Sequence, residues 1–337
     1  MKPKISVLTA VYNTAPFLKE CLDSLCNQTM KEVQFVCVDD ASTDGSGAIL
    51  DEYAARDARF VVIHQPKNQG QAVARNIGLE HAEGEFIAIL DSDDWYEPNS
   101  LQLAYEAISL HPQADVALFQ LVYRYADGTK KYYANKACNN AISGQDAFKL
   151  SIASWQIHGL YLVRRQLHLR YPFDASSSTY SDDNTTHLHY LHARQVVFSE
   201  GVYNYRQNPQ SVTQAVSLRR FDRLQADLSL KKILEEEVAA GSIADGQEIL
   251  RLNEQQRWLH VIDCYWIYYQ NRSLFSTEDK QYIFGLFKAI LPTIDKKKIT
   301  TGQKLKLGYY PFHSFRLFRL SETLYMGLKS LLYRHHL

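Results

Sequence analysis

Three acidic residues follow a short apolar run in the segment FIAILDSDDW at 86–95. Carboxylates this close together repel one another unless a cation lies among them. Magnesium and manganese bind through one or two carboxylates, and water and substrate phosphate supply their other oxygen ligands. The D-x-D spacing therefore predicts that Asp91 and Asp93 bracket Mn²⁺ or Mg²⁺ that also holds a diphosphate. The alternative is a solvated acidic turn in which Asp93 or Asp94 caps a helix opened by Pro98.

Strands that alternate with helices are predicted to position these residues. The expected strands are 5–11, 33–38, 60–64 and 86–90, and the expected helices are 46–56, 71–81 and one capped by Asn13 or Thr14 with Pro16 in its first turn. This alternation implies parallel βαβ units, in which ligands bind beyond the carboxyl ends of the strands.

Polar residues collect at those strand ends. Tyr12, Asp39, Asn68 and the Asp91/Asp93 pair each follow a predicted strand. The G-x-G-x-x-G fingerprint and the G-x-x-x-x-G-K-[ST] phosphate loop are both absent from the sequence. A nucleotide bound here is therefore expected to be held by side chains and metal, not by a glycine-rich loop.

The pattern changes further along the chain. A strand at 116–125, a turn at 126–129 and residues 130–133 predict an antiparallel hairpin, and helices are expected at 145–152 and from Thr185 to about Arg194. A strand follows at 196–199. From Leu218 onward the pattern is helical, with a capping-box start at 276–279. We therefore predict one domain over 1–215 and a helical region over 216–337.

Composition excludes several classes of protein. The chain has 337 residues, of which 46% are hydrophobic, and its 37 basic and 37 acidic residues cancel, so no global field favours nucleic acid. Five cysteines without a C-x-x-C pair argue against a disulfide framework or a zinc site. The sequence shows no signal peptide and no apolar stretch long enough to span a bilayer, so we expect a cytoplasmic protein.

The C-terminal tail, about 296–337, departs from this neutral average. It holds nine lysines and arginines against one acid, Glu322. Five leucines share one helical face, with Arg316, Arg319 and Lys329 off it; they are Leu317, Leu320, Leu324, Leu328 and Leu331. This pattern favours a helix that lies on an anionic membrane surface. The alternative is that the leucines pack on the rest of the protein or on a second subunit.

Five blocks of this sequence resemble family 2 glycosyltransferases, the inverting enzymes of GT-A fold that use nucleotide sugars. The blocks are ISVLTAVYN (5–13), VDDASTDG (38–45), NQGQAVARNIG (68–78), GEFIAILDSDDW (84–95) and YNYRQNPQS (203–211). The resemblance implies an α/β fold, a GT-A Rossmann-like mixed sheet flanked by helices and followed by the C-terminal helical region. It also implies a bacterial role in surface-polysaccharide assembly.

The resemblance implies roles for the residues of the nucleotide-sugar site. Asp39 is expected to accept the imide N–H of uracil from a UDP-sugar, with Thr9, Ala10 and Tyr12 forming walls around the base. Asn68 and Arg75 match further positions of that pocket. Asp93 is the expected metal ligand, with Asp91 nearer the ribose and metal-bound water and Ser92 between them. The metal would act as a Lewis acid on the departing diphosphate.

Inverting transfer needs a base to deprotonate the acceptor hydroxyl. The family places that base in a Glu-Asp pair at the head of a helix, whereas this chain has Asp182-Asp183. The resemblance assigns the role to Asp183, with Asp182 orienting the acceptor. The alternative is that one of the two is only the N-cap of the helix that follows. His187, His189 and His192 do not share a helical face, so we expect solvated or core histidines there and no metal site.

Arg206 and Ser211 match family positions that close over the diphosphate, where a guanidinium suits phosphate oxygens. The resulting prediction is a metal-dependent hexosyl- or N-acetylhexosaminyltransferase that uses a nucleotide-sugar donor and a saccharide or lipid-linked saccharide acceptor. The sequence is compatible with a homo-oligomer. A nucleotidyltransferase would show a glycine- and basic-rich first loop, which this chain lacks. The remaining alternative, a catalytically silent nucleotide-sugar binder or assembly scaffold, would have no need of Asp183.

Overall fold

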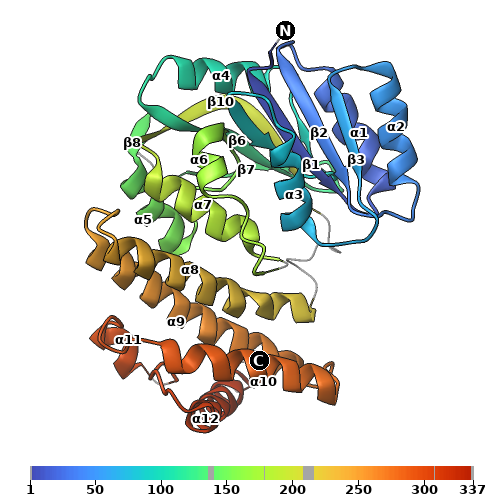
Figure 1. Ribbon diagram of the computed structural model, residues 1–337. Helices are drawn as coiled ribbons and strands as arrows, with labels where there is room; N and C mark the ends of the chain where they lie inside the picture. Colours follow the sequence, from blue (N-terminus) through green and yellow to red (C-terminus); the bar gives the residue numbers. More distant parts are fainter. Residues whose placement is uncertain (1, 136–139, 178, 208–215, 307, 335–337) are drawn as a thin grey trace. The chain divides into compact units, whose positions relative to one another are not determined.

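The protein consists of two compact units, Met1–Pro209 and Gln210–Leu337 (Figure 1). The computed structural model describes residues 2–135, 140–177, 179–207, 216–306 and 308–334, with side chains described up to Lys329. The predicted domain boundary at 215/216 borders residues 208–215, which lie outside the described part.

The first unit is built on one ten-stranded mixed sheet with helices packed against it. Its elements, in chain order, are β1 (Ile5–Val11), α1 (Ala15–Cys26), β2 (Val33–Asp39), α2 (Ser46–Arg56), β3 (Phe60–His64), α3 (Gln71–Glu80), β4 (Phe86–Ile89), β5 (Trp95–Tyr96), α4 (Ser100–Ser109), β6 (Ala114–Arg124), β7 (Lys130–Tyr132), β8 (Ala141–Ser143), α5 (Gly144–Ser154), β9 (Tyr161–Arg164), α6 (Arg165–Arg170), α7 (Ser181–His192) and β10 (Gln195–Arg206). The predicted class, an α/β mixed sheet flanked by helices, is confirmed.

Strand direction decides where the polar strand ends meet. The central order is β3-β2-β1-β4-β9-β6-β10-β5. Strands β1 to β4 are parallel, and β9 runs antiparallel between β4 and β6. Strand β6 therefore runs in the same direction as β4, and β10 is parallel to β6. The carboxyl ends of β1, β2, β3, β4, β6 and β10 lie at one edge of the sheet, which we call the carboxyl edge, whereas β9 and β5 run in the opposite direction.

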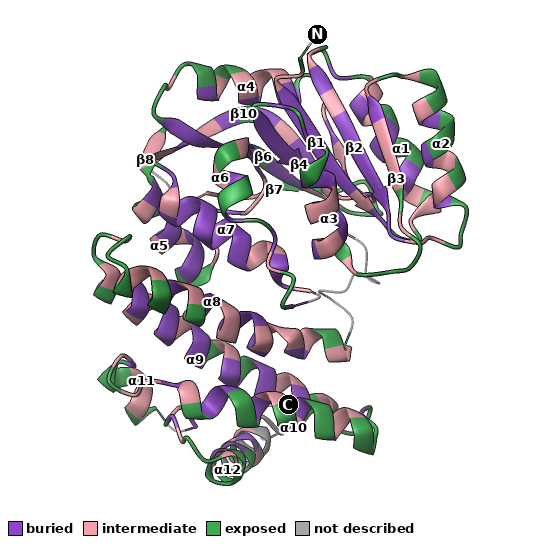
Figure 2. Ribbon diagram, viewed as in Figure 1, coloured by how far each residue is buried: buried purple, intermediate pink, exposed green. Residues whose placement is uncertain are grey.

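The residues of the central strands are mostly buried (Figure 2), and most of the buried ones are apolar. The β-branched run of β1 is almost wholly buried, and α1 packs through Leu18, Cys21, Leu22 and Leu25. Thr14 occupies the N-cap position of α1 as predicted, but its side chain makes no capping hydrogen bond. The backbone N–H of Ala15 instead donates to Asp44 Oδ2 at 2.9 Å, which ties the loop after β1 to the loop after β2.

Two predicted helix starts are wrong. Helix α4 begins at Ser100 with Asn99 at its N-cap, so neither Asp93 nor Asp94 caps it. The intervening residues form β5, which pairs with β10 and holds the chain extended. Helix α7 begins at Ser181, four residues before the predicted start at Thr185, and the Thr185 hydroxyl donates to the Ser181 carbonyl oxygen within it.

The second unit is helical, as expected. It contains η1 (Leu218–Asp222), α8 (Arg223–Ala239), α9 (Gly246–Asn271), α10 (Thr277–Ile290), η2 (Leu291–Thr293), α11 (Thr301–Leu305) and α12 (Phe315–Arg334). Its core is aromatic, with Trp258, Tyr265, Phe287 and Phe318 buried together. The predicted capping box is present, because Ser276 and Asp279 cap each other's backbone N–H groups. Among the described residues, no helix is long and apolar enough to cross a membrane.

Candidate active site

The carboxylate of Asp39 lies at the end of β2 and is held from two sides. Its Oδ1 accepts the backbone N–H of Ser42 at 2.9 Å, and its Oδ2 lies 2.9 Å from Nδ1 of His64. A β-carbon on Gly47, in the first turn of α2, would lie only 2.8 Å from Oδ2. The glycine therefore lets a helix N-terminus approach the carboxylate closely. Each carboxylate oxygen has a second lone pair and can still accept a ligand N–H.

Asp40 positions the helix that carries Arg75. Its two oxygens accept the backbone N–H groups of Gln69 and Gly70 at 2.9 and 2.8 Å. These bonds fasten the loop after β3 to the end of β2, immediately before α3 begins at Gln71. The start of α3 is therefore fixed at the carboxyl edge, and Arg75 on its second turn faces the acidic segment.

Arg75 joins two acidic segments that are far apart in the sequence. The side chain is buried, with 3% of its surface exposed, and its Nη2 lies 2.5 Å from Asp91 Oδ1. Its Nη1 lies 3.8 Å from Asp182 Oδ2. The guanidinium also lies over the ring of Phe173, 5.1 Å from the centroid. The structure thus brings Asp91 and Asp182, both predicted site residues, to one guanidinium group.

The turn after β4 is fastened to the end of β10. Asp94 accepts the Tyr203 hydroxyl at 2.8 Å and the backbone N–H of Arg206 at 2.7 Å. The Tyr203 hydroxyl in turn accepts the backbone N–H of Asp91 at 3.1 Å. Asp94 is therefore a buried structural carboxylate, which leaves Asp91 and Asp93 as the acids of this turn that face outward.

Arg206 is not an isolated surface arginine. Its Nε donates to the carbonyl oxygen of Asp93 at 2.8 Å, and its Nη2 lies 2.5 Å from Glu20. The guanidinium lies over the rings of Trp95 and Phe17 at 4.8 and 5.1 Å. The arginine therefore stands beside the acidic turn with its orientation set by four neighbours. Ser211, the other predicted residue of this segment, lies outside the described residues.

The electrostatics of the turn suit a divalent cation. Loss of solvent and the neighbouring Asp91 raise the pKa of Asp93 to about 6. Within the described residues, no hydrogen bond from another residue to the Asp93 carboxylate is present, whereas Asp91 already pairs with Arg75. No group of three or more potential ligands occurs in the described part of the chain. The residues therefore fit a hard cation that takes one or two carboxylates here and its other oxygens from a diphosphate and water.

Asp182 and Asp183 both lie in the first turn of α7, where Tyr180 is the N-cap residue and makes no side-chain cap. The predicted alternative, that one of them is the N-cap, is wrong. The backbone N–H of Asp183 donates to Asp182 Oδ1 at 3.1 Å. Loss of solvent raises the pKa of Asp182, and Arg75 opposes that rise. The first turn of a helix stabilises negative charge, so it is a favourable position for a carboxylate.

The other predicted residues lie along the same edge. Thr9 is buried in β1, Ala10 is half-buried, and Tyr12 has 46% of its surface exposed. Asn68 is exposed in the loop before α3, and Ser92 is buried within the acidic turn. Of these residues, only Tyr12 and Asn68 are exposed at the edge.

His187 and His189 of α7 are core residues, as one of the two predicted alternatives had it, whereas His192 is half-buried. His189 bonds through both ring nitrogens, to the Tyr161 hydroxyl and the Tyr171 carbonyl oxygen, each at 2.8 Å. His187 lies 2.9 Å from the Ser151 hydroxyl.

Sequence reasoning missed His64, Asp94 and Tyr203. The strand register brings His64 opposite Asp39 across β2 and β3, which a periodicity argument could have found from the aligned strand ends. Its hydrogen bonds to Asp39 and Asp51 raise the pKa of His64, and loss of solvent opposes this rise without cancelling it. The contacts of Asp94 and Tyr203 depend on long-range pairing, for which the sequence carries no local signal.

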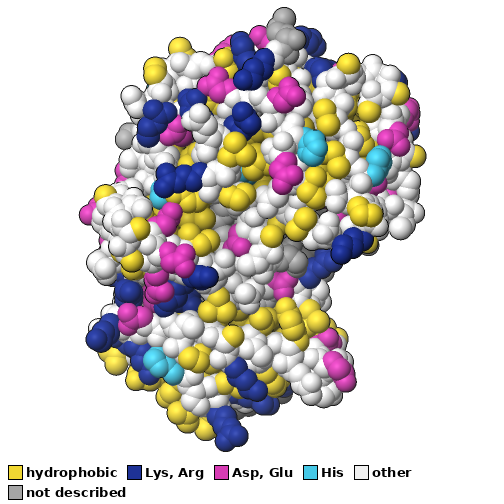
Figure 3. Space-filling model, viewed as in Figure 1, with side chains coloured by type: hydrophobic (Ala, Val, Ile, Leu, Met, Phe, Trp, Pro, Cys, Tyr) yellow, Lys and Arg dark blue, Asp and Glu magenta, His cyan; other side chains and the backbone are white. Residues whose placement is uncertain are grey.

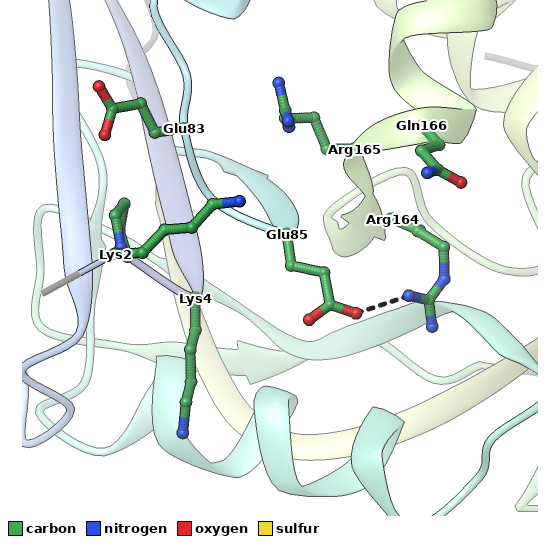
Figure 4. Close-up of a pocket in the computed structure, with 8 residues that line it drawn as sticks. Lys2, Lys4, Glu83, Glu85, Arg164, Arg165 and Gln166 are labelled. Carbon is green, nitrogen blue, oxygen red and sulfur yellow. Dashed lines mark hydrogen bonds and ion pairs between the residues drawn. The ribbon is translucent and has the colours of Figure 1, made fainter.

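A surface pocket of about 470 Å³ lies at the opposite edge of the sheet (Figure 4). It is lined by residues that precede β1 and β4 and by the end of β9. Glu85 and Arg164 pair across it at 2.7 Å. Because none of the carboxylates described above lines it, this pocket is separate from the candidate active site.

The chain is similar to known proteins over most of its length. The model of the family described as "Glycosyl transferase family 2" matches residues 6–171. Glycosyltransferase GlyG of Streptococcus pneumoniae serotype 4 is 30% identical over 223 residues, which are 63% of this chain and 73% of GlyG. The putative glycosyltransferase EpsH of Bacillus subtilis is 32% identical over 228 residues, 65% of each chain. The chain thus spans slightly less than two thirds of EpsH.

A solved structure has the same fold. The crystal structure of S. aureus TarS 1-349 in complex with UDP-GlcNAc aligns with a TM-score of 0.73 at 19% identity, covering 96% of this chain and 92% of that chain. The likeness extends through both units of the chain.

Proposed function

This chain belongs to glycosyltransferase family 2 and has the GT-A fold, and on that premise we propose that it is an inverting sugar transferase. The donor is a nucleotide sugar, UDP-linked, and the acceptor is a saccharide or lipid-linked saccharide of a surface polysaccharide. One observation carries this proposal. Arg75 joins Asp91, at the donor end of the site, to Asp182 in the first turn of α7, so donor and acceptor groups meet at one edge.

The donor side of the site extends from β2 to β4. Asp39 accepts the imide N–H of uracil, and Thr9, Ala10 and Tyr12 border the base. Asn68 and Arg75 bind further along the nucleotide, and Asp91 and Ser92 lie toward the ribose. Arg206, beside Asp93 and tied to Glu20, binds the diphosphate. The family resemblance assigns Ser211 to the same role, but this residue lies outside the described part of the chain. A fixed guanidinium loses little entropy when it binds phosphate oxygens.

Asp93, with Asp91 beside it, would hold Mn²⁺ or Mg²⁺. The bound cation would act as a Lewis acid that neutralises charge on the departing diphosphate. The raised pKa of Asp93 follows from loss of solvent and from the negative charge of Asp91, and a cation relieves both.

Asp183 takes the proton from the acceptor hydroxyl as its oxygen attacks the anomeric carbon. The bond from that carbon to the diphosphate oxygen breaks, and its electron pair leaves with the nucleotide. Asp182, held toward Arg75, orients the acceptor. Attack from the face opposite the leaving group inverts the anomeric configuration.

The first test measures nucleotide release from UDP-, GDP-, TDP- and CMP-sugars with Mn²⁺, for wild type, Asp183→Asn and Asp182→Asn. We expect release of UDP from a UDP-hexose or a UDP-N-acetylhexosamine. Asp183→Asn should lower kcat by about 10²-fold or more, because general bases contribute that much, while UDP affinity stays unchanged. If Asp183→Asn keeps full activity and Asp182→Asn loses it, then Asp182 is the base and Asp183 orients the acceptor. Binding of UDP without release of sugar from any donor would favour the silent-binder alternative.

The metal assignment predicts a pH dependence. A carboxylate binds Mn²⁺ only when ionised, so Mn²⁺ affinity should fall as pH decreases through about 6. Asp93→Asn should abolish Mn²⁺ binding measured by calorimetry, and EDTA should abolish transfer. Wild-type activity in EDTA would refute metal dependence.

The outer face of α12 supports a proposal of peripheral membrane contact. Leu317, Leu320, Leu324 and Leu328 are 53–60% exposed, while Phe318, Glu322 and Met326 face the core. Lys and Arg lie beside yellow hydrophobic side chains over α12 (Figure 3). Arg319 lies over the ring of Phe284, and Lys329 lies over the ring of Trp266. Because these two cations already contact the protein, the proposal depends mainly on the exposed leucines. Leu331 lies outside the described side chains.

Co-sedimentation with phosphatidylglycerol vesicles tests this face. The double variant Leu320→Ser, Leu324→Ser should lose binding. The variant Leu274→Ser should retain it, although Leu274, in the same unit, is even more exposed at 70%. Such a protein would work at the inner face of the plasma membrane. If the double variant instead converts an oligomer into a monomer in light scattering, a second copy covers the leucines, and the membrane proposal fails.

A further inference from the structure

A row of half-buried aromatic side chains lies at the carboxyl edge on the far side of the acidic turn from Asp39. It consists of Tyr205 on β10, Tyr123 on β6, Tyr133 just after β7, and Trp155 at the end of α5; we call it the aromatic row. The ring centroids of Tyr205 and Tyr123 are 5.8 Å apart, and those of Tyr123 and Tyr133 are 6.3 Å apart. The Tyr133 hydroxyl donates to the carbonyl oxygen of Trp155. The row is thus continuous from strand to helix.

One end of the row is at the acidic turn. Tyr205 lies two residues after Tyr203, so both side chains are on the same face of β10. The Tyr203 hydroxyl bonds to Asp94 and to the backbone N–H of Asp91. Loss of solvent raises the pKa of Tyr205, and Asp91 and Asp94 raise it further. Tyr205 therefore stands next to the groups assigned to the donor diphosphate.

The other end is at the acidic pair of α7. The indole of Trp155 stacks on the imidazole of His187, with centroids 4.8 Å apart and planes inclined by 27°. The Ser151 hydroxyl bonds to His187 Nδ1 and fixes that ring. His187 follows Asp183 by four residues, and such residues are neighbours on one helical face. Trp155 is therefore about one helical turn from the proposed base.

Trp155 also has an unusual backbone conformation. Its φ of 49° and ψ of 53° are left-handed, at the position where a helix commonly ends in glycine. Its N–H donates to the Ser151 carbonyl oxygen, and that of Gln156 donates to Leu150. A bulky side chain is disfavoured in this region, and such outliers concentrate at binding sites. The indole is held here although glycine would fit the backbone better.

We propose that the aromatic row is the acceptor subsite, on which a neutral saccharide stacks with its reacting hydroxyl beside Asp183. This inference rests on the proposed transferase function and adds the chemistry of the acceptor. One face of a pyranose ring carries mainly C–H groups, which pack on an aromatic ring, while hydroxyls at its rim bond to phenol oxygens. Tyrosine and tryptophan offer both an apolar face and a polar edge. All four rings remain half-buried, so part of each ring is open to a ligand.

The aromatic row and the groups that bind the base and the ribose occupy different parts of the carboxyl edge. The groups assigned to the base and the ribose lie at the ends of β1, β2 and β4, whereas the row begins on β6 and β10, on the other side of β9. Arg206, at the end of β10, lies next to Tyr205 and is assigned to the diphosphate. The acidic turn lies between the two halves. An acceptor on the row therefore meets the donor at the metal and the diphosphate, as transfer requires.

The test uses Trp155→Gly in the full chain. Glycine adopts the left-handed conformation without strain, so this variant should fold while it removes the indole. Tyr132→Ala is the matched control, since Tyr132 is 58% exposed and alternates with Tyr133 to the opposite side of its strand. A second variant, Tyr123→Leu, keeps an apolar side chain in β6 but removes the ring.

The probes are cellopentaose, maltopentaose and chitopentaose at millimolar concentration, measured by saturation-transfer NMR with UDP and Mn²⁺ present. We expect at least one probe to bind the wild type and Tyr132→Ala equally, and Trp155→Gly and Tyr123→Leu at least tenfold more weakly. UDP affinity should be equal in all four proteins. Unchanged saccharide binding by Trp155→Gly, or no binding of any probe to the wild type, would overturn the inference. If the wild type itself does not bind UDP, the proposed donor site is refuted instead.

Discussion

Replacing Arg75 by methionine would test the charge arrangement of the site most directly. The guanidinium is 3% exposed and lies 2.5 Å from Asp91, whose side chain is 26% exposed. Removing one partner of a buried ion pair costs about 3–5 kcal/mol, since the other charge is left uncompensated. Partial exposure of Asp91 places the expected loss near the lower limit, about 3 kcal/mol. Methionine keeps the apolar contact with Phe173.

The double variant Arg75→Met, Asp91→Asn should recover most of this loss, because the uncompensated charge is then absent. Hydrogen exchange of β1 and β4 peptides measures the stability of the first unit separately from the second. Added Mn²⁺ should stabilise Arg75→Met more than the wild type, since a cation can replace the guanidinium beside Asp91. A loss below about 1 kcal/mol, or a double variant no more stable than Arg75→Met, would refute the electrostatic reasoning.

Two further predictions concern one residue in each unit. Gly47→Ala should weaken UDP binding about tenfold in calorimetry, equivalent to about 1.4 kcal/mol, because its β-carbon would lie 2.8 Å from Asp39 Oδ2. Gly285→Ala in α10, which meets no atom within 4 Å, is the control, and equal UDP affinity in both variants would contradict the expectation. Glu322 is fully buried, and burial raises its pKa from 4.5 to about 8. The native state therefore keeps a proton that the unfolded state releases, so the stability of the second unit should decrease as pH rises from about 5 to 8. Glu322→Gln should remove this decrease, whereas Glu278→Gln, an exposed glutamate of α10, should not; a decrease that persists in Glu322→Gln would place its origin elsewhere.

The strand ends of the donor half could be predicted from sequence because they follow from local patterns. An apolar run that stops at Asp39 or at Asp91 marks a buried strand and its end, and parallel βαβ units bring such ends to one edge. The family resemblance added roles to those residues, and the fold places them along the predicted edge. Two arguments were sufficient to predict this half of the site. Short-range hydrophobic periodicity located the strands, and the parallel direction of strands in βαβ units placed their carboxyl ends at one edge.

The other half depends on contacts that no local pattern encodes. The pairing of Arg75 with Asp182 joins α3 to α7, and the bond between Asp94 and Tyr203 joins the acidic turn to β10. The start of α7 was misjudged because Ser181 and the two aspartates read as loop residues, although Thr185 bonds back within the helix. Nothing in the sequence near Trp155 indicates that its backbone is left-handed. Such features arise only when the register of distant strands has been set.

The charges at the edge show why these long-range contacts matter. Four carboxylates, those of Asp91, Asp93, Asp94 and Asp182, share this edge with two guanidiniums, those of Arg75 and Arg206, but the ion pairs to Asp91 and Asp182 are both made by Arg75. Asp94 is satisfied by neutral donors, and Arg206 divides its contacts between Glu20 and a backbone oxygen. Arg75 alone must therefore balance Asp91 and Asp182, so Asp93 remains the carboxylate with the strongest need of a cation. If a diphosphate and its metal bind at Asp93, they also change the field that Arg75 transmits to Asp182. Donor binding and acceptor orientation would then be linked through one side chain, and Arg75→Met should remove that link.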